Sequence, residues 1–303
     1  MAFLNALPGA VAQGLIWGLM AIGVYISYKI LDMADLTVDG SICTGGCVCA
    51  VLITAGVPVW ISILLAFLAG ALTGVVTGLL HTALGIPAIL AGILTQLMLY
   101  SVNLSILGGK SLLSVYNFKD QLLLHMSKST HSIITMVLIV TAVIVGLWLF
   151  FYTEVGLTLK STGDNPDMSR AQGVNVKFNK VLGLAISNGI VALAGALYAM
   201  YKGSISLNDG RGAIVIGLAA IFIGLSISLK IKPNFVVSLI GVVGGGIVYF
   251  VIYNLVILMG LKTDYLKMLS AVIVAIFLAV PYLKSEYFGK KKPKMVKGGG
   301  GNA

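Results

Sequence analysis

The sequence predicts an all-α, polytopic transmembrane helix bundle of about nine spans. Of its 303 residues, 58% are hydrophobic and only 10% are charged, and the mean hydropathy is +1.03. A soluble globular domain carries roughly a quarter charged residues, so a water-soluble enzyme is excluded. The apolar residues form blocks of about 20, the length at which an α-helix crosses a bilayer, whereas transmembrane barrels need alternating segments of about ten. The 37 glycines among the blocks suit closely packed membrane helices.

Nine apolar blocks mark the expected spans along the chain. They are Leu7–Tyr28, Gly40–Gly56, Val59–Thr82, Pro87–Leu107, Ser132–Tyr152, Lys180–Tyr201, Ile214–Leu229, Phe235–Met259 and Leu266–Leu283. The second and seventh blocks are short. The first block precedes the first positive charge, Lys29, and lacks the small-residue cleavage site of a signal peptide, so we expect it to remain as a helix.

The positive charges predict the orientation of this bundle. With the amino terminus outside and the carboxyl terminus cytoplasmic, most of the 20 lysines and arginines fall on the cytoplasmic side, as the positive-inside rule requires. The net charge of +10 therefore indicates topology rather than nucleic-acid binding. We expect a transmembrane domain over residues 1–284 and a lysine-rich, glycine-ended cytoplasmic tail over residues 285–303, disordered and attracted to anionic membrane lipids.

The sequence contains no convincing catalytic or metal-binding constellation. The three histidines are scattered and have no glutamate at a metal-binding helical spacing. Gly108–Ser111 resembles the end of a phosphate-binding loop, but Leu104 stands where that pattern needs its first glycine. Cys43, Cys47 and Cys49 have neither zinc nor redox spacing and are interpreted as buried packing residues. We therefore expect no cofactor on this chain, so that any ATP is bound by another subunit.

An acidic segment, Asp32–Ser41, lies between the first two spans and contains Asp35 and Thr37. Acidic side chains near a membrane are costly unless they are solvated or paired. The segment is either a polar cytoplasmic turn or, from Thr37 to Ser41, the non-helical start of a broken helix whose free backbone groups line a cavity. Both interpretations are compatible with the sequence.

The loop Thr153–Asn179 has the pattern of a short capped helix. Asp164 or Asn165 can accept hydrogen bonds from the first free N–H groups, and Pro166 suits the first helical position. Gly173 can close the helix, which gives a length of about eight residues. Such a helix, held between two spans, is either an ordinary loop helix or a rigid surface on which a partner docks.

Polar residues within the spans form two helix faces. The first face comprises Gln96, Tyr100 and Asn103, and the second comprises Tyr249, Tyr253 and Asn254. The first set is spaced i, i+4 and i+7, so its members lie on one side of a helix. Because amides are expensive against lipid, both faces should point into the bundle. There they either bond neighbouring helices or line a solute pathway.

Three stretches of the chain carry a resemblance to a known family. Asp35–Ser41 reads Asp-Leu-Thr-Val-Asp-Gly-Ser and is similar to the Asp-Leu-Ser-Val-Gly-Ser segment of sugar permeases, with Asp39 as an insertion. Gly156–Gly173 resembles a cytoplasmic coupling loop, and Gly210–Ala219 resembles the start of a later helix of the same family. Over about residues 15–283 the chain thus resembles the membrane subunit of a bacterial ABC importer, in the family of ribose-type and branched-chain amino acid permeases.

This resemblance implies partners for the chain. It implies a homodimer of permease subunits in the bacterial cytoplasmic membrane, two cytoplasmic ATPase subunits that bind ATP and Mg, and an extracellular or periplasmic solute-binding protein. The loops Gly108–His131 and Ser204–Arg211 would be available to the binding protein. The Thr-Val-Asp-Gly sequence resembles the branch linked with aromatic amino acid uptake.

The resemblance also implies roles for individual residues. Coupling to the ATPase would involve Thr162, Gly163, Asp164, Asn165, Pro166, Arg170 and Gly173. The substrate pathway would involve Asp35, Thr37, Gln96, Tyr100, Asn103, Tyr249, Tyr253 and Asn254. The main alternative is an ion-coupled secondary transporter or channel without an ATPase partner, which predicts functional acids in the middle of the spans. The sequence places none there.

Overall fold

The computed structural model describes residues 2–124, 129–228 and 234–258, and the isolated residues 268, 271, 272, 274, 275 and 279. Over this part of the chain the fold is a bundle of helices, so the predicted all-α class is confirmed. The helices are α1 (Ala2–Tyr25), α2 (Val38–Thr54), α3 (Val59–Thr82), α4 (Ala88–Ile106), α5 (Ser129–Tyr152), α6 (Glu154–Asp164), α7 (Pro166–Ala171), α8 (Val176–Lys202), α9 (Ala213–Ser228) and α10 (Phe235–Leu258). A π-helix, η1 (Ile26–Ile30), continues α1, and a 3₁₀ segment, η2 (Tyr116–Gln121), precedes α5.

Six of the described helices are long and apolar enough to cross a membrane: α1 with η1, α3, α4, α5, α8 and α10. The apolar helices α2 and α9 are shorter. The predicted ninth span, Leu266–Leu283, and the predicted tail, residues 285–303, lie outside the continuously described residues. Helix α8 begins four residues before the predicted Lys180 because the Asn175 side chain caps it and accepts a 3.1 Å hydrogen bond from the Phe178 N–H.

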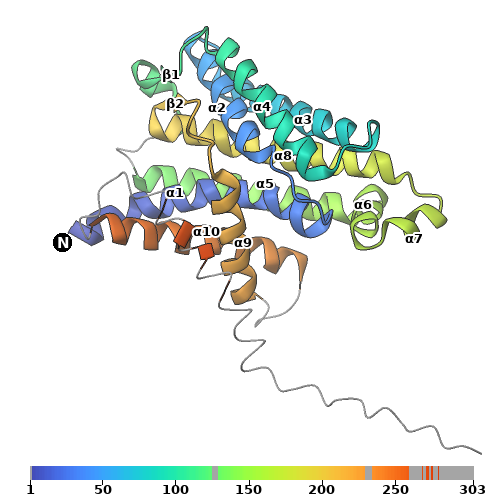
Figure 1. Ribbon diagram of the computed structural model, residues 1–303. Helices are drawn as coiled ribbons and strands as arrows, with labels where there is room; N and C mark the ends of the chain where they lie inside the picture. The colour runs from blue at the N-terminus through green and yellow to red at the C-terminus, as the bar shows by residue number, and fades with distance from the viewer. Residues whose placement is uncertain are drawn as a thin grey trace, which may run out of the picture.

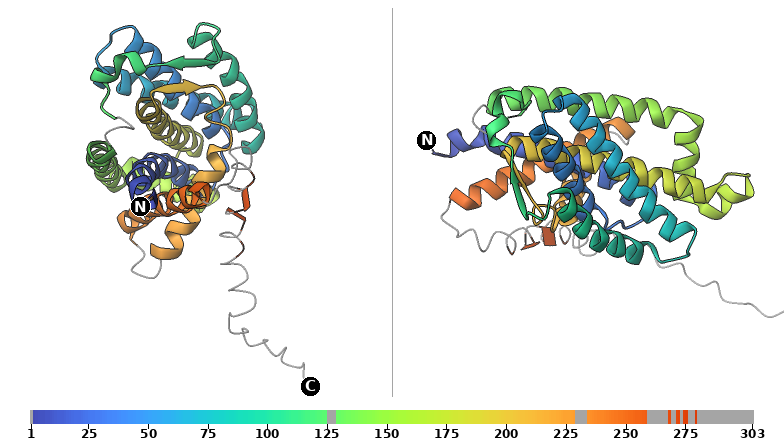
Figure 2. Two further views of the ribbon diagram at one scale, coloured as in Figure 1. Left: turned by 90° about the vertical axis from the view of Figure 1, so that its left-hand side faces the viewer. Right: turned by 90° about the horizontal axis from the view of Figure 1, so that it is seen from above.

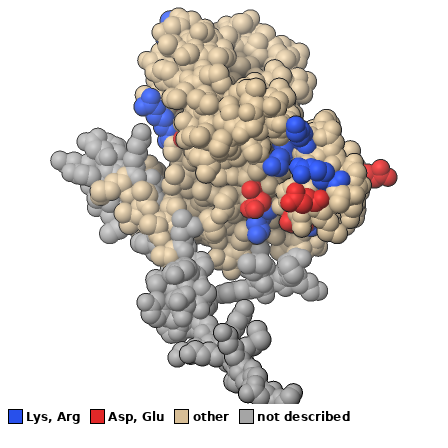
Figure 3. Space-filling model, turned by 45° about the vertical axis from the view of Figure 1, so that its right-hand side comes forward, with Lys and Arg blue, Asp and Glu red and all other residues tan. Residues whose placement is uncertain are grey.

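The two ends of the bundle differ in structure. Helices α6 and α7 lie at one end, and the start of α1 lies at the opposite end near two short strands (Figure 1). The long helices run in broadly the same direction, and several are seen end-on in the left view of Figure 2. Most of the surface in Figure 3 is uncharged, and acidic and basic side chains gather where the α6 and α7 end comes forward. This distribution suits a bundle surrounded by lipid along its length.

The two strands were not expected from the sequence. Strands β1 (Leu112–Ser114) and β2 (Ser204–Ser206) pair antiparallel, with Leu113 opposite Ile205. They come from the two loops that were predicted to face outward, so these loops form one connected surface. Each strand has only three residues and no extended alternating pattern, so no strand could be predicted from the sequence.

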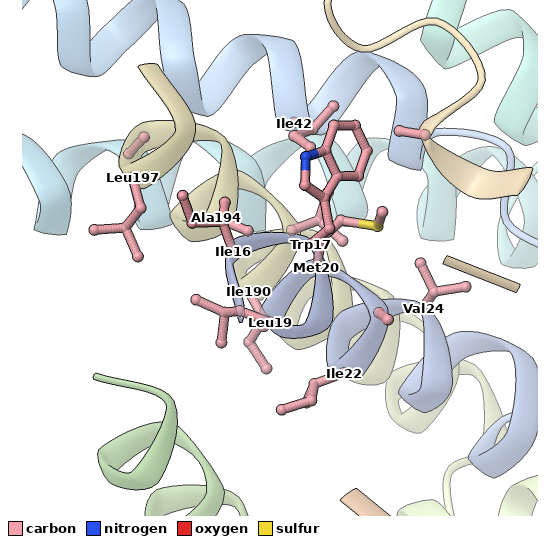
Figure 4. Close-up of a cluster of buried hydrophobic side chains, with 14 of the residues drawn as sticks. Ile16, Trp17, Leu19, Met20, Ile22, Val24, Ile42, Ile190, Ala194 and Leu197 are labelled. Atoms are coloured by element: carbon pink, nitrogen blue, oxygen red, sulfur yellow. The ribbon is translucent and has the colours of Figure 1, made fainter. Parts of the chain in front are cut away.

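Helix α8 lies at the centre of the bundle and packs against α1, α2 and α3. Figure 4 shows Ile16 and Leu19 of α1 beside Ile190 and Ala194 of α8, all buried. On the other side of α8, a Cβ added to Gly74 would overlap the backbone of Leu184. Glycine therefore lets α3 approach α8 more closely than any other residue would, as is common between membrane helices.

Candidate functional site

Asp35 lies inside the bundle rather than on a cytoplasmic turn. The chain from Asp32 to Asp35 is neither helix nor strand, and Asp35 is only 3% exposed. Its carboxylate accepts hydrogen bonds from the Thr37 N–H at 2.9 Å and from the Asn188 side-chain amide at 2.6 Å. Asn188 lies 12 residues (188 − 176) after the first residue of α8, about 18 Å along a helix that rises 1.5 Å per residue. The structure matches neither interpretation fully, because Asp35 is buried rather than on a solvated turn and the chain is already helical from Val38.

Hydroxyl groups extend this contact into a buried polar network between four helices. It comprises Asp35, Thr37, Ser41, Thr73, Thr77, Thr95 and Asn188. The Ser41 hydroxyl donates to the side-chain oxygen of Asn188 at 2.6 Å, and the Thr37 and Thr77 hydroxyls lie 2.7 Å apart. The sequence analysis selected only Asp35 and Thr37. The amide at position 188 in an apolar block was a usable signal, but the threonines follow no periodic pattern that distinguishes them from ordinary packing residues.

Asp39, which interrupts the motif of the sugar permeases, caps a different helix. Its carboxylate accepts hydrogen bonds from the Gly212 N–H at 2.8 Å and the Ile214 N–H at 2.9 Å, at the start of α9. A Cβ added to Gly210 would overlap the Asp39 carbonyl oxygen, so the two chain segments are in close contact. The amino-terminal ends of α2 and α9 therefore meet within the protein, where the positive ends of both helix dipoles favour a carboxylate. This arrangement explains why the second and seventh apolar blocks are short.

Replacing Asp39 with alanine should destabilise the protein modestly. The substitution leaves two N–H groups of α9 without their acceptor, and the loss of such a cap costs about 1 kcal/mol. The measurement is the thermal-unfolding midpoint of the purified protein in detergent. Asp167→Ala removes a carboxylate that is 91% exposed and serves as the control. Equal midpoints for the two variants would show that the Asp39 contacts contribute nothing.

The first polar face predicted from the sequence lines a cavity of about 240 Å³. Its walls include Asp39, Gly40, Cys43, Gln96, Tyr100, Asn103 and Arg211. The Arg211 guanidinium carbon lies 5.8 Å from the centre of the Tyr100 ring, within the range of a cation–π interaction. Asn103 is 1% exposed, and its side-chain oxygen has no hydrogen-bond partner within the described residues.

The second polar face contributes to another cavity, of about 440 Å³, whose walls combine aromatic with polar and aliphatic residues and which we call the aromatic cavity. Its walls include Trp17, Tyr198, Tyr249, Phe250, Tyr253 and again Arg211. The Trp17 and Phe250 rings stack with their centres 5.7 Å apart. Asn254 is not among the lining residues, because its amide donates to the Phe250 carbonyl oxygen of its own helix at 3.2 Å. Asp35 and Thr37 line neither cavity.

The loop that was predicted to carry one short helix forms two helices, α6 and α7. The break is at Asn165, whose backbone is extended (φ −155°, ψ 98°), as is favoured before proline. Of the two candidate caps, Asn165 is the one used, and its side-chain oxygen accepts a 3.0 Å hydrogen bond from the Met168 N–H. Helix α7 has six residues rather than about eight. Gly173 follows it with φ +82°, a conformation that favours glycine.

The predicted coupling residues divide into two groups by their environment. Thr162 is buried and accepts a 3.0 Å hydrogen bond from the Asn179 amide of α8. A Cβ added to Gly163 would overlap the Ile30 carbonyl oxygen of η1. The exposed members are Asp164, Asn165, Arg170 and Gly173, and Pro166 is half-buried. The first group therefore attaches α6 to the bundle, and the second lies on the surface.

Comparison with known proteins assigns the class of this bundle. A family model described as the permease component of a branched-chain amino acid transport system matches residues 7–280. The tyrosine transport system permease protein of Clostridioides difficile is 38% identical over 278 residues, which cover 91% of each chain. An uncharacterized protein of Rickettsia prowazekii is 32% identical over 91% of this chain and 98% of its own.

A more distant relative is a permease protein of the autoinducer 2 import system of Salmonella typhimurium, 26% identical over 63% of this chain and 56% of its own. No solved structure matches. The bundle is thus a multi-pass permease of a bacterial cytoplasmic membrane. The chain belongs to the family of branched-chain amino acid transport permeases, whose members are components of ABC-type transport systems.

Proposed function

We propose that this chain is the permease subunit of an ATP-driven importer for amino acids, with aromatic amino acids favoured. Two copies form the solute pathway, an ATPase that binds ATP and Mg docks on α7, and a solute-binding protein docks at the opposite end. The observation that carries the proposal is the rigid attachment of an exposed α7 to the bundle. A surface of this kind transmits the motion of a partner to the helices behind it.

The α7 surface combines an apolar side chain with charges. Met168 is 60% exposed, and Arg170 pairs with Asp167 at 3.4 Å, with both side chains largely exposed. An exposed ion pair of this kind contributes little to stability. Exposed methionine and arginine are instead residues that protein interfaces favour. The supporting contacts lie on the opposite side, where Ser169 is buried and donates to Ser161 of α6 at 3.2 Å.

The family and the cavities support an amino acid as the solute. The relative from Clostridioides difficile is called a tyrosine transport permease, and it aligns with nearly the whole chain. The aromatic cavity would contact a phenol or indole ring, and the polar cavity would contact the charged groups of the same solute. Gln96, Tyr100 and Asn103 would line the outer part of this pathway, with Tyr249 and Tyr253 beside it.

The docking proposal is tested by purifying the chain from its native membrane in mild detergent and measuring the ATPase that comes with it. In the double variant Met168→Glu/Arg170→Glu, co-purified ATPase should fall by about tenfold or more, because exposed anchors of this type dominate interface energies. Lys177→Glu, which reverses an exposed charge at the start of α8, is the matched control and should retain the ATPase. A double variant that retains the ATPase as well as the control does would contradict docking on α7.

One observation favours the alternative of an ion-coupled transporter. Asp35 places a carboxylate inside the bundle, and buried acids in membrane proteins often bind ions or protons. Against it, both carboxylate oxygens of Asp35 accept hydrogen bonds from the protein, and neither cavity reaches them. Uptake by the reconstituted chain alone, driven by an ion gradient and abolished by Asp35→Asn, would establish this alternative and exclude the importer.

A further inference from the structure

Arg211 lies within the stretch Gly210–Ala219 that resembles a permease helix start, but it was not among the predicted residues of the substrate pathway. It lies between β2 and α9, and its side chain lines both cavities described above. Arg211 is exposed and ends the loop that was predicted to face outward, so a solute can reach its side chain from solution. Within the described residues Arg211 forms no ion pair. Its guanidinium lies over the face of Tyr100, and its backbone N–H donates to the Asn208 carbonyl oxygen at 3.3 Å.

The two acids that line these cavities with Arg211, Asp209 and Asp39, bind other groups. Asp209 forms an ion pair with Lys202, with oxygen–nitrogen distances of 2.7 and 2.8 Å, and accepts a hydrogen bond from the Ser206 N–H. The Asp39 carboxylate accepts hydrogen bonds from two N–H groups at the start of α9. The guanidinium donors of Arg211 are therefore available to an anionic group that enters either cavity.

Asn103 supplies an independent indication of a ligand in the smaller cavity. Its side-chain oxygen is buried, and no described residue donates a hydrogen bond to it. Buried amide oxygens are rarely left without a donor, because the unsatisfied group loses its hydration. Asp39 and Gln96 line the same cavity, so its walls contain hydrogen-bond acceptors as well as the cationic guanidinium. This arrangement suits a molecule that carries an ammonium and a carboxylate group.

We propose that Arg211 binds the carboxylate of the transported amino acid while Asn103 accepts a hydrogen bond from its ammonium group. The planar guanidinium donates two parallel hydrogen bonds to a carboxylate, which an ammonium of lysine does not reproduce. The ring of the amino acid then lies against the aromatic cavity, which Arg211 also borders. This inference rests on the proposed function and names the residues that recognise the amino and carboxylate groups of the solute.

The test measures binding of radiolabelled L-tyrosine to the full permease and ATPase complex in lipid nanodiscs, without the solute-binding protein. Arg211→Gln should weaken binding by about tenfold or more, because a charge-assisted bidentate contact is lost. Arg211→Lys should recover only part of the affinity. Lys110→Gln removes an exposed charge from a neighbouring loop and should leave binding unchanged. 4-Hydroxyphenylpropionate, which keeps the carboxylate, should compete with tyrosine better than tyramine, which lacks it.

A second variant separates recognition from folding. Asn103→Leu removes an unsatisfied amide, so it should not lower the thermal-unfolding midpoint, yet it should weaken tyrosine binding. Wild-type affinity in Arg211→Gln, or the absence of saturable tyrosine binding in the unsubstituted complex, would overturn the assignment of Arg211. The proposed function is tested separately by ATP-driven tyrosine uptake with the binding protein present. Uptake that Arg211→Gln does not change would support the importer and contradict the role of Arg211.

Discussion

Replacing Asn188 with leucine is expected to lower the free energy of unfolding by about 3–5 kcal/mol, because it leaves a buried carboxylate without its partner. The Asn188 amide donates to Asp35 at 2.6 Å, and the same side chain accepts from Ser41 at 2.6 Å. Asn188 is fully buried and Asp35 nearly so, so water cannot replace these contacts. The measurement is denaturant or thermal unfolding of the purified protein in detergent, with the yield of folded protein as a second readout.

The double variant Asp35→Leu/Asn188→Leu distinguishes a lost partner from a packing defect. Removing both partners leaves no uncompensated charge, so the double variant should be more stable than Asn188→Leu alone. If the leucine simply overfilled the space around Asn188, the double variant would be at least as destabilised as the single one. Wild-type stability in Asn188→Leu would show that the Asp35 contact contributes little to the fold.

Much of the fold follows from local features of the sequence. Apolar blocks of membrane-spanning length predict α3, α4, α5 and α10 nearly to the residue, because hydrophobic length is the dominant constraint in a bilayer. The choice of Asn165, Pro166 and Gly173 as boundaries follows from capping chemistry that acts within a few residues. Exact helix ends were less predictable, as the earlier start of α8 shows. The loop before α8 contains several polar residues that could cap a helix, and the sequence alone does not show that Asn175 is the one used.

The candidate site was less predictable because its residues meet through long-range contacts. The i, i+4 and i+7 spacing of Gln96, Tyr100 and Asn103 places them on one helix face, but only the fold brings Arg211 to the same cavity. Asp39 is far in sequence from the N–H groups at the start of α9 that donate hydrogen bonds to its carboxylate. The pairing of β1 with β2 likewise depends on the positions of α4 and α8. Contacts between residues this far apart in the chain leave no pattern in a single sequence.

The position of Gly163 suggests how motion at α7 would reach the solute pathway. Gly163 of α6 contacts the carbonyl of Ile30 in η1, and η1 continues directly into α1. Helix α1 then runs to the opposite end of the bundle and contributes Trp17 to the aromatic cavity (Figure 1). Under the proposed function, a push on α7 would therefore reach α1 through backbone contact rather than through flexible side chains. This link is the second point at which a single substitution should have a large effect.

Replacing Gly163 with valine is expected to reduce ATP-driven solute uptake by about tenfold or more while the ATPase stays bound to the complex. The added side chain would overlap the Ile30 carbonyl oxygen and the nearby backbone of Leu31, neither of which can yield by a rotamer change. Overpacking of this kind costs about 1–3 kcal/mol, which is enough to separate α6 from η1 in most molecules. Uptake and ATP hydrolysis are measured together in proteoliposomes that contain the complete complex.

Gly146→Val is the matched control for this prediction. It makes the same chemical change in α5, where a Cβ would meet no atom within 4 Å, so uptake should stay near the wild-type value. In Gly163→Val, retained ATPase with lost uptake indicates that the contact with Ile30 carries the motion. Loss of folded protein would instead assign Gly163 to stability, and unchanged uptake in a folded variant would show that the motion reaches the pathway by another contact. The hydrogen bond between Thr162 and Asn179, which joins α6 to α8, is then another contact through which the motion could pass.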